Sequence, residues 1–123
     1  MEQLMEYLKV LADPTRIKII KFLLQGDMYV CELVEVMGVT QPTVSQHLRR
    51  LKAVGLVEEN KEGQRIRYRL GKDKMEEYEA TLKCFLAKPI YDIPQMQPEW
   101  ERYQKAVAGG IVLTCCLAEE DKG

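Results

Sequence analysis

Residues 30–70 read VCELVEVMGVTQPTVSQHLRRLKAVGLVEENKEGQRIRYRL, and their pattern gives the strongest indication of the fold. Its first part predicts two short helices, at about Val30–Met37 and Gln41–Val54, with Gly38 ending the first and Thr40 as N-cap of the second. The second helix carries apolar residues at helical spacing on one face and polar residues on the other. Two helices joined by so tight a turn are typical of a helix-turn-helix.

The second part of the stretch predicts a basic β-hairpin. Strands are expected at Leu56–Asn60 and Arg65–Leu70, joined by a loop at Lys61–Gln64 in which Gly63 suits the left-handed position. The second strand alternates apolar residues with arginines. A polar-faced helix that leads directly into such a hairpin indicates a winged helix-turn-helix, a mainly α fold with a small β-hairpin wing.

Helices are expected on both sides of this stretch. Asp13-Pro14 provides an N-cap and a first helical residue, which separates helices at about Glu2–Ala12 and Thr15–Gln25. A long helix is expected at about Lys72–Ala87, and after three prolines another at about Glu99–Ala108. The predicted domains are a winged domain for DNA binding and dimerisation at 1–88 and a C-terminal extension with vicinal cysteines at 89–123.

The composition is that of a globular protein, with 46% hydrophobic and 30% charged residues. The formal net charge of −1 hides an asymmetry, because residues 41–70 carry seven Lys and Arg against three Glu, leaving eleven basic against sixteen acidic residues elsewhere. A local basic zone suits phosphate binding. The chain shows no signal peptide and no apolar run long enough to cross a bilayer, so a cytoplasmic location without a membrane partner is expected.

The outer face of the predicted second helix carries side chains that recognise bases and phosphates. Gln pairs with adenine, Arg with guanine, and Ser or Thr with bases or phosphates. Arginines on the wing suit the phosphate backbone or the minor groove. The candidate DNA-contacting residues are Gln41, Thr43, Ser45, Gln46, His47, Arg49 and Arg50 on the helix and Arg65 and Arg67 on the wing. The competing interpretation of these side chains is an ordinary polar helix face in contact with solvent. The adjoining turn and wing favour DNA binding instead, with double-stranded DNA as the partner.

Four motifs occur in a specific order: LADPTR at 11–16, VCEL at 30–33, QPTVSQHL at 41–48 and GLV at 55–57. Together they resemble the ArsR/SmtB family of repressors over about residues 1–88. The resemblance implies a homodimer built from the first and last helices of the winged domain. It also implies operator binding without a cofactor and release of the operator when an inducer binds.

The resemblance does not extend to every sensor site of the family. Its zinc and nickel sites need paired histidines and carboxylates, and this chain has one histidine, His47, so that type of site is not expected. The arsenite motif of the family reads Cys-Val-Cys-Asp-Leu. Here the corresponding residues run from Tyr29 to Leu33, and only Cys31 matches a thiol of that motif.

The vicinal pair Cys115 and Cys116 resembles the sensor of some arsenic-responsive family members. Arsenite prefers three thiolates, and the third would come from Cys31 or Cys84, within one subunit or from the partner. The favoured function is therefore a repressor released by arsenite or another thiophilic ion such as cadmium or lead. A thiol-based redox or reactive-sulfur sensor of the same fold stays open. A small thiol-dependent enzyme is disfavoured because no catalytic base, phosphate loop or nucleotide fingerprint accompanies the cysteines, and a non-sensing interaction module is a further alternative.

Overall fold

A computed structural model describes residues 1–112. The chain separates into two compact units, the first comprising Met1–Leu82 and the second beginning at Lys83. The predicted division at residue 88, between the winged domain and the extension, stays a prediction. None of the described helices is long and apolar enough to cross a membrane.

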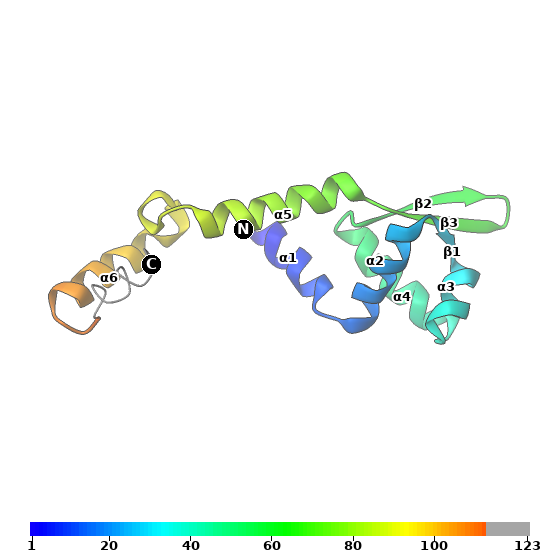
Figure 1. The fold of residues 1–123 in the computed structure, drawn as a ribbon, viewed down its shortest axis with the longest axis horizontal. Coiled ribbons are helices and arrows are strands. Elements are labelled where there is room, and N and C mark those ends of the chain that lie inside the picture. The colour runs from blue at the N-terminus through cyan, green and yellow to red at the C-terminus, as the bar shows by residue number, and fades with distance from the viewer. Residues whose placement is uncertain (113–123) are drawn as a thin grey trace. The chain divides into compact units, whose positions relative to one another are not determined.

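The first unit has the predicted winged helix-turn-helix fold (Figure 1). Its elements are α1 (Glu2–Leu11), α2 (Pro14–Gln25), β1 (Met28–Tyr29), α3 (Val30–Met37), α4 (Gln41–Ala53), β2 (Val57–Glu62), β3 (Arg65–Leu70) and α5 (Lys72–Ala87), which continues into the second unit. The bounds of α3 and α5 match the prediction, and those of α1, α2 and α4 differ from it by one residue.

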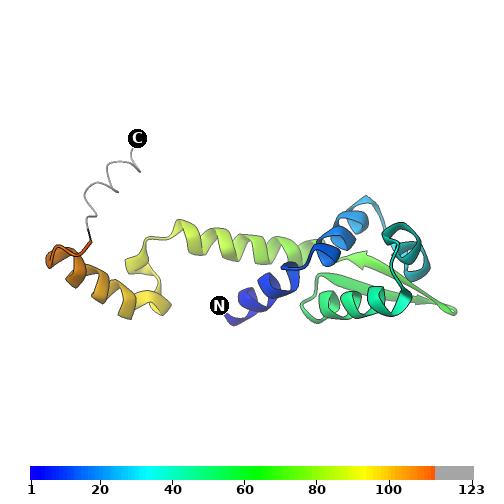
Figure 2. The ribbon, with the colours of Figure 1, turned by 90° about the horizontal axis from the view of Figure 1, so that it is seen from below.

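The core lies between the helices and the hairpin. Its most deeply buried side chains, each at most 2% exposed, are Ile19, Leu23, Leu33, Val44, Leu48, Leu51, Leu56 and Val57. Burying one such side chain contributes about 1.5–3 kcal/mol. Tyr7 of α1 stacks on Tyr78 of α5 with ring centroids 4.3 Å apart, which joins the first helix to the last within this unit. Figure 2 shows α4 running beside the hairpin, with which it shares the core.

The sheet differs from the prediction in two respects. It has three antiparallel strands in the order β1-β3-β2, and the short strand β1 was not expected. The predicted loop Lys61–Gln64 was too long, because Lys61 and Glu62 pair with Ile66 and Arg65 as part of β2. The turn is therefore confined to Gly63 and Gln64, with Gly63 at φ +64°. Such a tight turn follows the right-handed twist of the strands and extends the ladder by two residues.

The second unit contains two short 3₁₀ turns, η1 (Ile90–Asp92) and η2 (Pro94–Met96), followed by α6 (Gln97–Ala108). The helix predicted from Glu99 begins two residues earlier because the chain continues from η2 directly into it. Trp100 stacks on Tyr103 and meets Tyr91 edge to face, with centroids 5.6 and 6.0 Å away. This aromatic cluster fixes η1 against α6.

Candidate nucleic-acid interface

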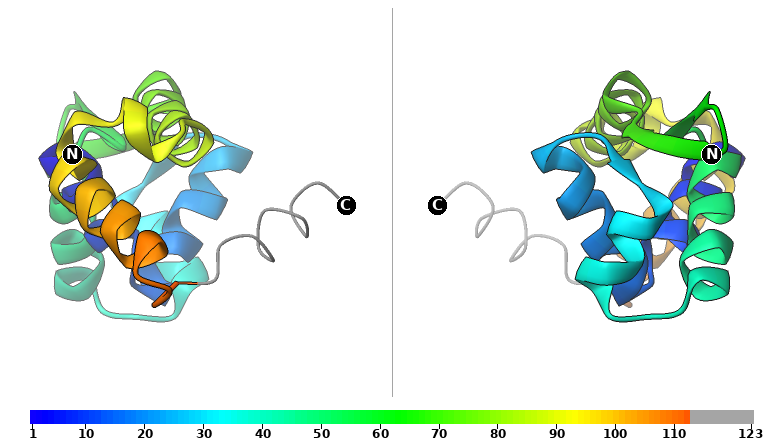
Figure 3. Two further views of the ribbon diagram at one scale, coloured as in Figure 1. Left: turned by 90° about the vertical axis from the view of Figure 1, so that its left-hand side faces the viewer. Right: turned by 90° about the vertical axis from the view of Figure 1, so that its right-hand side faces the viewer.

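The turn between α3 and α4 is set by one left-handed residue. Gly38 adopts φ +68° and its N–H donates to the carbonyl of Val34 at 3.0 Å, which ends α3. Val39 and Thr40 then lead the chain across to α4 (Figure 3, right, cyan to teal). Thr40 is the N-cap residue as predicted, but its hydroxyl contacts the hydroxyl of Thr43 at 2.9 Å and does not cap the backbone.

Helix α4 presents one apolar and one polar face, as its sequence predicts. Val44, Leu48 and Leu51 are at most 1% exposed and anchor the helix to the core. Of the candidate DNA-contacting residues, Gln41, Gln46, Arg49 and Arg50 are exposed, whereas Thr43, Ser45 and His47 are partly buried. The buried stripe thus fixes the rotation of α4 and leaves amide, hydroxyl and guanidinium groups on its outer side.

His47 has a partner within the protein. Its Nδ1 lies 3.3 Å from Nη1 of Arg16 on α2, whose Nε donates to the carbonyl of Val10. Since a guanidinium only donates, this contact needs an unprotonated Nδ1. His47 therefore braces α4 against α2 and is less free to reach DNA than its neighbours on the exposed face.

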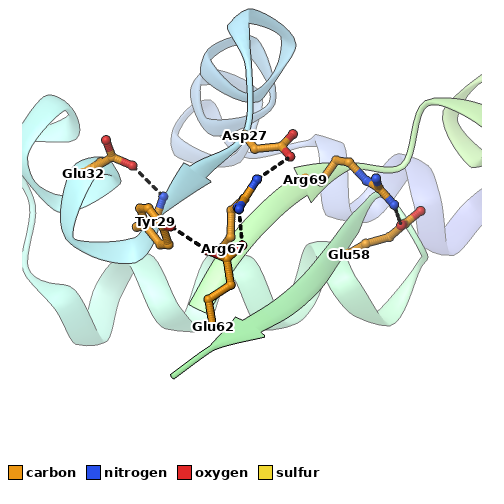
Figure 4. A network of polar contacts seen from close by, with 7 residues as sticks. All are labelled: Asp27, Tyr29, Glu32, Glu58, Glu62, Arg67 and Arg69. Carbon is orange, nitrogen blue, oxygen red and sulfur yellow. Dashed lines mark hydrogen bonds and ion pairs between the residues drawn. The ribbon is translucent and has the colours of Figure 1, made fainter. Parts of the chain in front are cut away.

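The wing arginines are held by intramolecular contacts (Figure 4). Arg67 pairs with Glu62 and lies 3.8 Å from Asp27, and Arg69 pairs with Glu58 at 2.8 Å. The carboxylate of Glu62 raises the pKa of Arg67 further above its already high value. Arg67, predicted to contact DNA, therefore has its charge largely offset by two carboxylates.

Arg65, the other predicted wing contact, is exposed and has a different environment. Its guanidinium lies over the ring of Tyr29, 3.9 Å from the ring centroid. One of its nitrogens lies 3.8 Å from Sγ of Cys31. No carboxylate forms an ion pair with Arg65 in the described residues. Arg65 thus keeps its charge available at the side of the wing nearest α3.

The predicted thiol ligands are only partly within the described structure. Cys31 lies in the first turn of α3 and Cys84 lies on α5, and both are exposed free thiols. Cys115 and Cys116 lie outside the described residues. Within residues 1–112, no group of three or more His, Cys, Asp or Glu side chains forms a metal-binding cluster.

Three residues of this region were missed by the sequence analysis. Tyr29, Asp27 and Glu62 form the polar network around the wing arginines. The Met28-Tyr29-Val30 run after Gly26, rich in strand-forming side chains, is the signal that would have indicated β1. Nothing in the local sequence indicates that the side chains of Tyr29 and Glu62, 33 residues apart, form a hydrogen bond.

Comparison with known proteins gives the family. A protein-family model described as "Bacterial regulatory protein, arsR family" matches residues 13–59 of this chain. An uncharacterized HTH-type transcriptional regulator of Methanocaldococcus jannaschii is 39% identical over 77 residues, covering 62% of this chain and 86% of that protein. This chain belongs to the arsR family of bacterial regulatory proteins. As an ArsR-family chain it is a DNA-binding transcriptional regulator and not an enzyme.

Two further relatives of this ArsR-family chain bear on its function. A Streptomyces lividans protein described as "Probable mercury resistance operon repressor" is 36% identical over 81 residues, covering 66% of this chain and 65% of that protein, just under two thirds. The solution structure of a homodimeric winged helix-turn-helix DNA-binding domain from Mycobacterium bovis is 31% identical, with a TM-score of 0.59, and the match covers 68% of this chain and 78% of that one.

Proposed function

We propose that this ArsR-family repressor binds double-stranded operator DNA as a homodimer and reads base edges with the outer face of α4. The observation that carries the proposal is the rotation of α4, which buries Val44, Leu48 and Leu51 and leaves Gln46 and Arg50 exposed. In a helix-turn-helix this second helix enters the major groove.

The candidate DNA-contacting residues of α4 divide into a base-reading group and a backbone-binding group. The amide of Gln46 suits a bidentate pair with adenine, and the guanidinium of Arg50 suits guanine. Gln41, Thr43, Ser45 and Arg49 suit phosphate oxygens, which fix the position of the helix without reading sequence. His47 supports this face from within through Arg16.

The homodimer is supported by the structure of the M. bovis relative and by exposed apolar side chains on α1. Met5 on α1 is 40% exposed, and Met1, the N-cap residue of this helix, is 48% exposed. The family resemblance assigns this helix to dimerisation. Two copies related by a two-fold axis would present two α4 helices to successive major grooves. Operator half-sites are then expected about 10 base pairs apart.

The proposed inducer is a thiophilic ion, with arsenite preferred. Cys115 and Cys116 supply two thiols, and Cys31 or Cys84, both exposed, supplies a third. Soft thiolate ligands select ions of this class. The description of the Streptomyces relative as a probable mercury resistance operon repressor supports a thiophilic ion as the inducer, but it does not favour arsenite over other ions of this class. Release requires only that the ion bind more tightly to the dimer that has left DNA than to the DNA-competent dimer.

The test is release of a fluorescently labelled operator, followed anaerobically by anisotropy while arsenite, mercury(II), cadmium or an oxidant is added. Arsenite is expected to release the DNA from the wild type. Cys115→Ser and Cys116→Ser are expected to stay bound, and Thr114→Ser, next to the pair but without loss of a thiol, serves as the matched control. The separate variants Cys31→Ser and Cys84→Ser identify the third ligand.

Two results would contradict the inducer assignment. If the wild type stays on DNA at saturating arsenite but leaves it on oxidation, the redox alternative holds. If Cys115→Ser and Cys116→Ser respond to arsenite like the wild type, the vicinal pair is not the sensor.

A further inference from the structure

Tyr29 lies where α3, the first helix of the helix-turn-helix, meets the wing. It is the N-cap residue of α3, and its backbone N–H donates to Oε1 of Glu32 at 2.8 Å. In β1 it pairs with Arg67 of β3. Figure 4 shows its ring facing the wing between these two elements.

Both ends of the Tyr29 side chain hold groups of the wing. Its ring lies under the guanidinium of Arg65, 3.9 Å away, and its hydroxyl donates to Oε1 of Glu62 at 2.7 Å. This hydrogen bond is the main cause that lowers the pKa of the Glu62 carboxyl, with the Arg67 guanidinium acting in the same direction. Glu62 in turn pairs with Arg67. A single aromatic residue therefore connects three side chains of the hairpin to α3.

The two neighbouring arginines are held in different ways. Arg67 directs Nη2 to the carboxylate of Glu62 and holds Nη1 3.8 Å from Asp27, so the outer end of its guanidinium faces two carboxylates. Arg65 is held by the flat face of its guanidinium against the ring. Stacking of this kind leaves the in-plane N–H donors free for phosphate oxygens, apart from the one directed at Cys31.

We propose that Tyr29 is a positioning residue for DNA binding: it holds the Arg65 guanidinium, and with it the wing, in the orientation that contacts the DNA backbone. This inference rests on the proposed function, in which Arg65 meets DNA. An exposed arginine loses rotamer freedom when it binds, and a guanidinium already stacked on a ring has lost part of that freedom beforehand. Tyr29 thus acts through Arg65 and does not need to touch DNA itself.

The test is a double-mutant cycle on operator affinity, measured by anisotropy at several salt concentrations. Arg65→Ala is expected to weaken binding about three- to tenfold and to reduce the salt dependence by about one phosphate contact. Tyr29→Leu, which removes ring and hydroxyl, is expected to weaken binding by a smaller or equal factor. The double variant is expected to bind no more weakly than Arg65→Ala alone.

Two variants separate the parts of the contact. Tyr29→Phe keeps the ring under Arg65 and loses only the hydroxyl, so it is expected to restore most of the affinity lost in Tyr29→Leu. Arg65→Lys keeps the charge but not the planar group, and it leaves Tyr29 and the fold intact, so it tests the stacked contact even if Tyr29→Leu does not fold. It is expected to bind at least twofold more weakly than the wild type. Arg69→Ala is the matched control, because Arg69 pairs with Glu58 and its effect should add to that of Tyr29→Leu.

The proposal is overturned if Tyr29→Leu and Arg65→Ala weaken binding additively, or if Arg65→Lys binds like the wild type. It is also overturned if Arg65→Ala is without effect while Arg50→Ala loses affinity, and in that case the proposed function stands. Absence of binding to any duplex by the wild type would instead contradict the proposed function itself.

Discussion

Asp13 shows how a single side chain begins α2, the helix that supports α4. Its carboxylate accepts the backbone N–H groups of Thr15 at 2.9 Å and Arg16 at 3.1 Å, at the N-terminus of α2. The hydrogen bond from the Arg16 backbone is the main cause that lowers the pKa of the Asp13 carboxyl. Arg16 then contacts His47 of α4, so the Asp13 cap also fixes the position of Arg16, which braces α4 through His47.

Replacing Asp13 with Ala is expected to lower the free energy of unfolding by about 1 kcal/mol at neutral pH, because two helix N–H groups lose their acceptor. The folded-state pKa lies below the unfolded value of about 3.9, so the stabilisation is present above that pH and is lost as the pH falls through the folded pKa. Urea unfolding at a series of pH values checks this. The difference between the wild type and Asp13→Ala should shrink below about pH 4, whereas Asp13→Asn, which caps without titrating, should differ from Asp13→Ala equally at every pH.

Gln46 is the residue whose replacement tests base reading most cleanly, because its side chain is exposed between buried Val44 and Leu48. Gln46→Ala is expected to relax the preference at one base pair of each half-site, at a cost of about 1–3 kcal/mol on the preferred base. Competition binding with single-base operator variants measures the preference. Gln104→Ala, an equally exposed change on α6, should leave it unchanged; equal loss on all sequences in Gln46→Ala would assign Gln46 to phosphate contact.

At the scale of elements, local patterns predicted what depends on local structure. The stripe of Val44, Leu48 and Leu51, the Asp13 cap and the Gly38 stop each act within one or two helical turns, so the helices of the winged domain could be placed to within a residue. The length of the hairpin turn and the strand β1 could not, because both depend on pairing with β3. The pairing of the wing arginines, likewise, is a product of tertiary contacts.

The junction between the hairpin and α5 depends on a close backbone approach. The N–H of Gly71 donates to the carbonyl of Leu56 at 2.8 Å, and a Cβ at Gly71 would lie within 3.0 Å of the carbonyl oxygen of Gly55. Gly71→Ala is expected to destabilise the fold by about 1–3 kcal/mol, because backbone must move to admit the methyl group. Thermal unfolding measures the loss. Gly109→Ala, whose Cβ would meet only an ordinary contact at 3.4 Å, is the control, and equal stability of the two variants would contradict this role of Gly71.

At the scale of the whole molecule, recognition of two operator half-sites requires two copies of the chain. Sedimentation equilibrium is expected to give the mass of a dimer. Met5→Asp is expected to shift the protein towards monomer by replacing an exposed apolar side chain of α1 with a charge. Ile17→Asp, at 46% exposure on α2, is the matched control and should remain dimeric. Equal dissociation of both variants would remove α1 from the interface.

The thiol site also belongs to the scale of the whole molecule, because no local sequence pattern predicts which thiols come together. Cys31 and Cys84 are the candidates for the third thiol, and both are exposed. Their use as ligands depends on Cys115 and Cys116 and on the second copy of the chain, so the metal site stays a prediction. The candidate DNA-contacting face of α4, in contrast, lies within one winged domain, and its contacts with DNA are a prediction as well.

Selecting bound duplexes from a random pool and sequencing them tests whether a dimer reads DNA through the outer face of α4. We expect enrichment of an inverted repeat whose half-sites lie about one helical turn apart, and loss of that enrichment in the double variant Gln46→Ala, Arg50→Ala. A pool without an enriched sequence, or the same inverted repeat selected by the double variant, would contradict it.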